Sequence, residues 1–159
     1  MKFKQYQFLR QEAIKRLKAK EIRSAYEKIS LPIDIAKTLD PIMLAYIGDA
    51  VYSMYVRVEL CSISISKVQI LHALVTDFIN AKAQATSFVT ISNLLNESEA
   101  LIARRARNSH VNVPKSSSVQ EYRASTAFEA ILGFLYITKQ KERLNSFMDT
   151  AFSITLETL

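Results

Sequence analysis

The chain has 159 residues, of which 49 % are hydrophobic, and a formal net charge of +6, which suits one globular domain with a substantial core. No apolar stretch approaches the ~20 residues that span a bilayer, and the N-terminus lacks the apolar segment of a secretory signal. Cys61 is the only cysteine and there are two histidines, which excludes disulfides and a Cys/His zinc site. We therefore expect a cytoplasmic protein without a membrane partner.

The N-terminal segment carries the whole excess of positive charge. Residues 1–28 hold nine Lys or Arg and three Glu, and the remaining bases and acids of the chain cancel. Its loosely helical spacing of apolar residues predicts one or two amphipathic helices. We therefore divide the chain into a basic helical extension over 1–35 and a main domain over 36–159. Packing on its own domain or a second subunit, nucleic-acid contact and a membrane surface are the alternatives for this extension.

The main domain is predicted to be all-α, because only two glycines and three prolines interrupt the chain and no segment alternates like a strand. Residues 34–60 predict a lead-in and a long helix, with Asp40 as its N-cap and Pro41 in its first turn. Residues 64–95 predict a helical region that is broken near 88–92. Further helices are expected at 96–108, 119–140 and 141–159.

Two acidic residues lie inside otherwise apolar helical segments, each beside one of the two glycines. Gly48 precedes Asp49 in the apolar run 44–55, and Gly133 follows Glu129 by one helical turn. Because the first helix is apolar nearly all round, we expect it to be buried in the domain or at an interface, with Asp49 away from bulk water. Glycine permits close approach of a neighbouring backbone or of a ligand. A crossing of the two helices there would bring both acids to one point.

Two carboxylates that meet in a low-dielectric pocket repel each other and need a proton or a cation between them. Mg²⁺, which binds oxygen ligands and retains waters, is the natural cation. The alternative is structural: each acid forms a core ion pair with an arginine, for example Arg57 or Arg123. The residue pattern by itself does not decide between a metal site and two structural pairs.

A short basic stretch lies at 103–123. Its cations are Arg104, Arg105, Arg107, Lys115 and Arg123, against Glu121 alone. The start of the stretch continues a helix, and its centre, rich in Asn, Ser and Pro, predicts an ordered loop. Guanidinium groups match phosphate oxygens, which favours phosphate binding. For some of these arginines, a favourable interaction with the C-terminus of the helix is the structural alternative.

The segments that carry the two acids resemble those of a known family. "LAYIGDAVY" (44–52) resembles the signature helix of the ribonuclease III catalytic domain, and "YRASTAFEAILGFLY" (122–136) resembles its second acidic helix. "RRARN" followed by "PKSSSVQEYR" is similar to the basic loop of the Mini-ribonuclease III branch, which lacks a double-stranded-RNA-binding domain. We expect no such domain here. The similarity covers about 36–150.

The resemblance implies the helical fold of a ribonuclease III endonuclease domain and a homodimer that cleaves double-stranded RNA with Mg²⁺, or with Mn²⁺ as a substitute. It gives Asp49 and Glu129 the catalytic and metal-binding positions, and it makes the cations of the basic stretch RNA-binding residues. The implied substrate is the precursor of the large-subunit (23S) ribosomal RNA, with a ribosomal protein or the assembling large subunit as a partner. Larger relatives carry further acids at the positions of Ile42, Ala45 and Thr126, which predicts a thinner protein shell around the metal here.

Two other classes of function stay open at this point. A non-catalytic RNA-binding or ribosome-assembly factor with this fold would bind RNA without cutting it, although the presence of both Asp49 and Glu129 favours an enzyme. A helical dimerisation or adaptor protein would account for the apolar helices. It would leave the two acid–glycine pairs without a reason.

Overall fold

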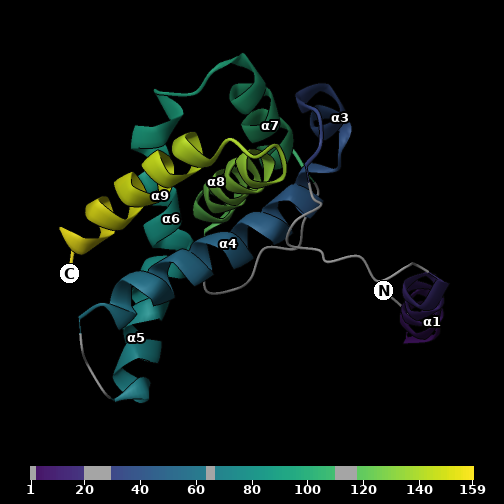
Figure 1. Cartoon of the computed structure of the whole chain (residues 1–159), viewed down its shortest axis with the longest axis horizontal. Helices are drawn as coiled ribbons and strands as arrows, with labels where there is room; N and C mark the ends of the chain where they lie inside the picture. The colour runs from purple at the N-terminus through teal and green to yellow at the C-terminus, as the bar shows by residue number, and fades with distance from the viewer. Residues whose placement is uncertain (1–2, 20–29, 64–66, 110–117) are drawn as a thin grey trace.

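In the computed structural model, the described residues 3–19, 30–63, 67–109 and 118–159 contain helices and connections but no strand. The predicted all-α class is therefore confirmed. The helices are α1 (Phe3–Ala19), α3 (Ile33–Thr38), α4 (Pro41–Cys61), α5 (Val68–Ile79), α6 (Ala81–Ser92), α7 (Glu97–Arg107), α8 (Val119–Ile137) and α9 (Lys141–Leu156), shown in Figure 1. Within these described ranges, no helix combines the length and apolarity that crossing a membrane requires.

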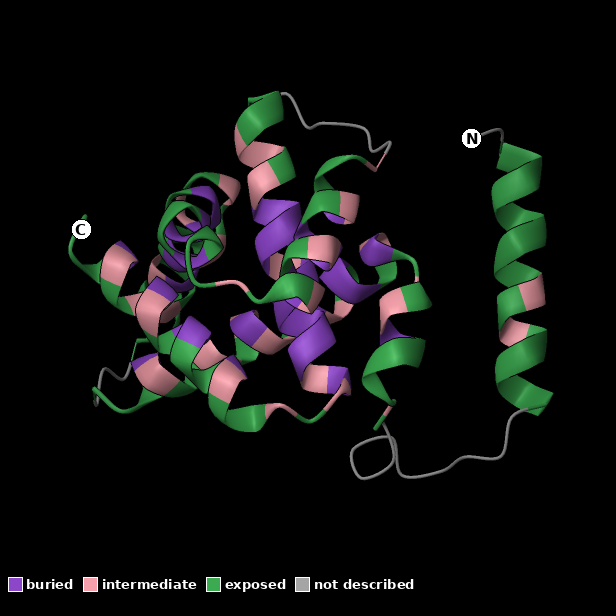
Figure 2. Cartoon of the chain, turned by 90° about the horizontal axis from the view of Figure 1, so that it is seen from above, coloured by how far each residue is buried: buried purple, intermediate pink, exposed green. Residues whose placement is uncertain are grey.

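Helices α4 and α8 form the centre of the fold and share its most extensive helix–helix contact. Every residue of α8 from Ser125 to Ile137 is buried except Glu129 and Tyr136, which are half-buried. Helices α6, α7 and α9 pack around this pair, and the buried residues follow the central helices in Figure 2. A helix that is surrounded in this way needs apolar side chains on nearly all faces. The acid at position 129 is therefore the exception that calls for an explanation.

The two glycines lie where the backbones of α4 and α8 touch. A Cβ atom added to Gly48 would overlap the carbonyl oxygen of Glu129 and lie 2.8 Å from the backbone nitrogen of Gly133. A Cβ atom added to Gly133 would overlap the carbonyl oxygen of Leu44. Of the two roles that the sequence allowed for these glycines, close backbone approach is the one that the structure shows. The space beside Gly48 is filled by α8 and is not open to a ligand.

Capping residues set the helix boundaries. Asp40 caps α4 as predicted, since its side chain accepts a hydrogen bond from the backbone nitrogen of Ile42 at 2.9 Å. The predicted break near 88–92 is wrong, because the chain breaks at Asn80, between α5 and α6. Asn80 has an extended backbone, and its side chain accepts a hydrogen bond from the backbone nitrogen of Ala83 at 3.0 Å. Such a cap starts a new helix and ends the previous one.

A third acid, Glu99 in α7, is more buried than either acid singled out from the sequence. It has no exposed surface, and its two oxygens accept hydrogen bonds from Arg143 at 2.9 and 2.8 Å. The guanidinium of Arg143 also lies 4.5 Å from the centre of the Phe147 ring. This bidentate pair is a structural link between α7 and α9. The sequence did not single it out because Glu99 lies in a polar first turn.

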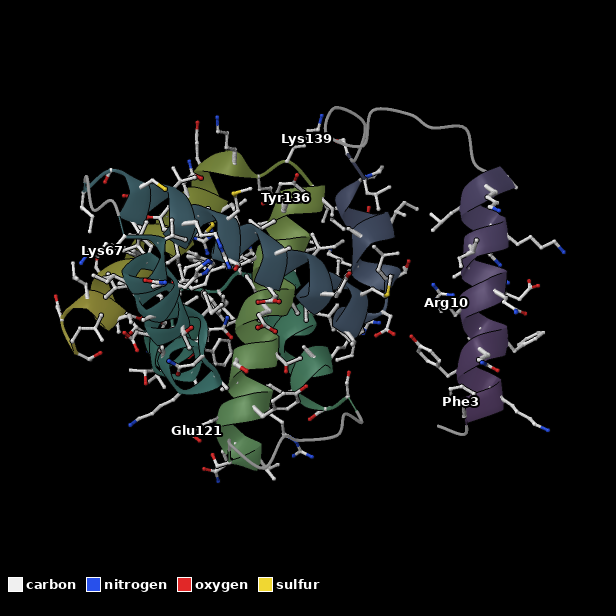
Figure 3. All side chains as sticks on the ribbon, turned by 90° about the horizontal axis from the view of Figure 1, so that it is seen from below. Phe3, Arg10, Lys67, Glu121, Tyr136 and Lys139 are labelled. Atoms are coloured by element: carbon white, nitrogen blue, oxygen red, sulfur yellow. The ribbon has the colours of Figure 1, made fainter. Side chains whose placement is uncertain are left out.

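The N-terminal extension contains one described helix, α1, which has no buried residue. Side chains such as Phe3 and Arg10 project from it on all sides (Figure 3). Residues 20–29, where a second helix was an option, lie outside the described residues. Toward the end of the extension, Leu31 contacts the main domain, since its backbone nitrogen donates a hydrogen bond to the carbonyl oxygen of Ile137 at 2.9 Å. The predicted division at 35/36 stays a prediction.

Candidate active site

Asp49 and Glu129 line one cavity of about 320 Å³ between α4, α6 and α8. Asp49 projects from α4 and is exposed, whereas Glu129 projects from α8 and is half-buried. The expected meeting of the two acids at a helix crossing is therefore observed. The expected withdrawal of Asp49 from bulk water is wrong, because this side chain is exposed to solvent.

The structural alternative, in which each acid pairs with an arginine, does not describe this site. Among the described residues, no Lys or Arg nitrogen lies within 4.0 Å of either carboxylate. Arg57 donates instead to the carbonyl oxygen of Ser53 at 2.7 Å, and Arg123 lines a different cavity. The two carboxylates thus line one cavity without a Lys or Arg of the described residues in salt-bridge contact with either of them.

This arrangement perturbs the half-buried acid. Burial, and to a smaller extent the negative charge of Asp49, raises the pKa of Glu129 to about 8, while the side chain of Gln84 acts in the opposite direction. Two nearby carboxylates repel each other, so the more buried one holds its proton more tightly. Glu129 is therefore in part protonated near neutral pH when no cation is bound, and a cation that binds there displaces this proton.

The donor set fits a hard divalent cation that keeps most of its waters. Carboxylate oxygens are the ligands that Mg²⁺ prefers, and Mg²⁺ is commonly held by one or two of them. The cavity is also lined by Ile42, Ala45 and Thr126, the three positions at which larger relatives are expected to carry acids. Among the described residues, no group of three or more His, Cys, Asp or Glu side chains could hold a metal ion. A cation here would rest on Asp49 and Glu129.

Three of the five cations of the basic stretch share a second cavity, of about 290 Å³. Arg104 and Arg107 reach it from α7, and Arg123 reaches it from the first turns of α8. Arg123 and Glu129 are six residues apart on the same helix, which is about 9 Å along its axis. The arginine cavity and the acidic cavity therefore border the same helix, although on different sides of it, because six residues turn the helix by about 240°.

The other two cations differ from these three. The guanidinium of Arg105 donates to the backbone carbonyls of Lys37 and Leu39, at 2.9 Å for Leu39, and so ties α7 to the end of α3. This geometry gives Arg105 a structural task, although at the end of α3 and not at the C-terminus of its own helix, where the structural alternative placed it. Lys115 lies outside the described residues, and its RNA-binding role stays a prediction.

Sequence reasoning missed Gln84, a buried amide of α6 that lines the acidic cavity with Asp49 and Glu129. A signal was present in the sequence. Gln84 precedes the apolar residues Phe88 and Ile91 at helical spacing, so it occupies a core position of its helix. A polar residue at such a core position indicates a role beyond packing, as an acid in an apolar run does.

Comparison with known proteins shows that the fold is that of a ribonuclease III domain. A family model described as "Ribonuclease III domain" matches residues 43–140, a range that contains both Asp49 and Glu129. Among solved structures, the crystal structure of protein FN1578 from Fusobacterium nucleatum is similar, with a TM-score of 0.68 and 29 % sequence identity. The similarity covers 73 % of this chain and 93 % of that one.

Known relatives of the chain indicate which group of the ribonuclease III family it belongs to. "Mini-ribonuclease 3" of Thermoanaerobacter sp. (strain X514) is 42 % identical over 121 residues, which cover 76 % of this chain and 85 % of the relative. "Mini-ribonuclease 3" of Staphylococcus aureus (strain NCTC 8325 / PS 47) is 38 % identical over 125 residues, covering 76 % of this chain and 92 % of that protein. This chain belongs to the Mini-ribonuclease 3 group of the ribonuclease III family. It is accordingly an endoribonuclease.

Proposed function

We propose that this endoribonuclease cleaves double-stranded RNA with Mg²⁺, or with Mn²⁺ as a substitute, and that Asp49 and Glu129 are its catalytic, metal-binding residues. One observation supports this most. The two carboxylates line the same cavity, and neither is paired with a Lys or Arg among the described residues. Such a pair of like charges is costly unless a proton or a cation relieves the repulsion, and a cation that binds both carboxylates displaces the proton of Glu129.

The metal, when bound, supplies Lewis-acid polarisation of a phosphate oxygen and a lowered pKa for a coordinated water. The contribution of the chain is to hold the two carboxylates in a fixed relation. Both project from helices, and the backbones of these helices touch at Gly48 and Gly133. Sites built on helices hold their geometry better than sites built on loops. The apolar walls at Ile42 and Ala45 add no further ligand, so waters would complete the coordination of a bound cation.

We assign RNA-phosphate contacts to Arg104, Arg107 and Arg123, together with Lys115. Duplex RNA is recognised largely through its phosphates and 2′-hydroxyl groups. The first three residues line one cavity beside α8, and planar guanidinium groups can each contact two phosphate oxygens. Arg105 is the weakest of the predicted RNA-binding residues, because its guanidinium is used by the carbonyls of Lys37 and Leu39.

We also propose that the protein acts as a homodimer through the outer face of α4. Met43, Tyr46, Met54 and Val58 are 58 to 78 % exposed on this helix. They recur at helical spacing and form an apolar stripe, which is a feature of interaction surfaces. Because the stripe and Asp49 lie on the same helix, a dimer formed through this face would hold two acidic cavities in one particle.

The substrate that we propose is the precursor of the large-subunit (23S) ribosomal RNA, cut near its ends in the cytoplasm. A ribosomal protein or the assembling large subunit is the proposed partner. The resemblance to the Mini-ribonuclease III branch supports this choice. The competing function, a non-catalytic RNA-binding factor, predicts binding without cleavage.

Cleavage of a long RNA duplex in Mg²⁺ separates the two functions. Wild type is compared with Asp49→Asn and Glu129→Gln, and with Asp77→Asn, which changes an exposed acid of α5, as the matched control. RNA binding is recorded for all four proteins. We expect wild type and the control to cut, and the two site variants to bind without cutting. Binding without cleavage by wild type, in Mg²⁺ and in Mn²⁺, would support the binding factor instead.

A further inference from the structure

Gln84 occupies an unusual position for an amide. It lies on the inner face of α6, is 2 % exposed, and lines the acidic cavity with Asp49 and Glu129. Its neighbours on the same face of the helix, Phe88 and Ile91, are buried apolar residues. At this depth the side chain cannot reach a duplex that lies outside the cavity. We therefore expect the amide to interact with other groups of the protein.

The amide is not fully satisfied by the protein. The Nε2 atom of Gln84 has no hydrogen-bond partner of regular geometry among the described residues. A buried amide donor without a partner costs about 1–3 kcal/mol, and an apolar side chain of similar volume would avoid this cost. The presence of glutamine therefore indicates a task that an apolar residue cannot perform.

Two other polar side chains of α8 near Glu129 already have hydrogen-bond partners. The hydroxyl groups of Ser125 and Thr126 also line the cavity, but both donate to the carbonyl oxygen of Tyr122, at 2.9 and 2.8 Å. They are occupied within their own helix. The Gln84 side chain, by contrast, lines the same cavity as Glu129 and acts to lower the pKa of its carboxyl group. Of these three lining groups, it alone has a donor to spare.

We propose that Gln84 is a positioning residue that holds the Glu129 carboxylate for the divalent cation. Its Nε2–H group donates to one oxygen of the ionised carboxylate and leaves the other oxygen turned toward Asp49 and the cavity. The choice of donor follows from the charge, because the amide carbonyl would repel an ionised carboxylate. Groups of this kind commonly orient carboxylate ligands of metal ions. The inference rests on the proposed function, since it takes Glu129 as a metal ligand.

Metal affinity, and not activity alone, tests this role. Binding of Mn²⁺ to wild type, Gln84→Met and Gln84→Leu is measured by titration calorimetry, and thermal melting is followed alongside. Both substitutions keep the volume and remove the amide. We expect Mn²⁺ affinity to fall about 10- to 100-fold, kcat for duplex cleavage to fall in parallel, and KM for the duplex to stay within about twofold. The metal-free melting temperature should change little, because an unsatisfied donor is removed.

The matched control is Ser87→Ala, which removes another buried polar group of the same helix. The hydroxyl of Ser87 donates to the carbonyls of Ala83 and Ala151, at 3.1 and 3.3 Å, away from the cavity. We expect this variant to lose stability and keep its Mn²⁺ affinity. If Ser87→Ala weakened Mn²⁺ binding as much as the Gln84 variants did, general loosening of α6 would explain the result and the proposal would fail.

Failure of the inference and failure of the proposed function give different results. Gln84 variants that bind Mn²⁺ as tightly as wild type, in a wild type that cuts RNA, overturn the inference and leave the function intact. An increased KM with unchanged Mn²⁺ affinity would mean that Gln84 contacts RNA, which also overturns it. If the Gln84 variants lose Mn²⁺ affinity but wild type never cuts RNA, the proposed function alone is overturned. Loss of folding in both variants would show that the amide is structural and would overturn the inference.

Discussion

Replacing Glu129 by glutamine is expected to stabilise the metal-free protein, by an amount that grows with pH. Burial and the charge of Asp49 raise the pKa of Glu129 from 4.5 to about 8. Between these two values the folded protein retains a proton that the unfolded chain has lost. The free energy of unfolding therefore falls as the pH rises through this window. The neutral amide of Glu129→Gln does not titrate and escapes the loss.

The magnitude follows from the size of the pKa change. A rise from 4.5 to about 8 corresponds to at most about 5 kcal/mol. Glu129 is half-buried, and its contact with solvent reduces this to about 2–3 kcal/mol. For a chain of this length, such a difference shifts the melting temperature by about 5–10 °C. We expect this shift at pH 9 and almost none at pH 5.

Differential scanning calorimetry in a chelating buffer at pH 5, 7 and 9 measures the effect, with Asp77→Asn as the control. Added Mg²⁺ should then raise the melting temperature of wild type and leave that of Glu129→Gln unchanged, because the variant lacks one of the two carboxylates. The reasoning is refuted if the difference between wild type and Glu129→Gln is the same at pH 5 and pH 9.

Three further predictions follow from the fold and its surfaces. Gly48→Ala should lower the free energy of unfolding by about 2 kcal/mol or more by calorimetry, despite a gain of about 1 kcal/mol in helix propensity; an unchanged melting temperature would contradict the backbone contact. Arg107→Gln should weaken duplex binding and reduce the slope of log K against log salt by about 1. Arg105→Gln should instead lower the free energy of unfolding by about 1–2 kcal/mol. An equal loss of RNA affinity in both variants, measured by filter binding, would contradict the assignment of Arg107 to RNA binding and of Arg105 to the fold. Met54→Asp should give monomers in sedimentation with little loss of stability, because the side chain is exposed; a persisting dimer would exclude this face.

The helices themselves were largely predictable from the sequence. Few residues interrupt helical spacing, and a local cap such as Asp40 fixes a helix start through bonds within four residues. The break at Asn80 was missed because the apolar pattern continues through it. An asparagine starts a helix only if its own backbone is extended, and apolar spacing does not report that conformation.

The site was predictable in part, and the limits have physical reasons. The acid–glycine pattern correctly brought Asp49 and Glu129 together, because backbone contact between two helices requires glycine on both. The exposure of Asp49 was not predictable. An apolar helix face looks the same in sequence whether its own chain covers it or whether it stays exposed, as it does at Met54. The contrast between Arg105 and Arg107 likewise depends on carbonyls of α3 that are distant in the sequence.

The backbone contact between α4 and α8 determines how this enzyme fails when it is mutated. The separation of the two acids depends on the contact between the main chains of α4 and α8 at Gly48 and Gly133, and side chains elsewhere in the core are not part of this contact. A smaller side chain at Phe134 or Ile102 would reduce the number of folded molecules before it altered the rate of each one. A core mutation then lowers activity by lowering the amount of folded enzyme, which a chaperone or a lower temperature can restore. Substitution of either glycine instead changes the relative position of the two acids in the folded enzyme, which neither a chaperone nor a lower temperature can repair.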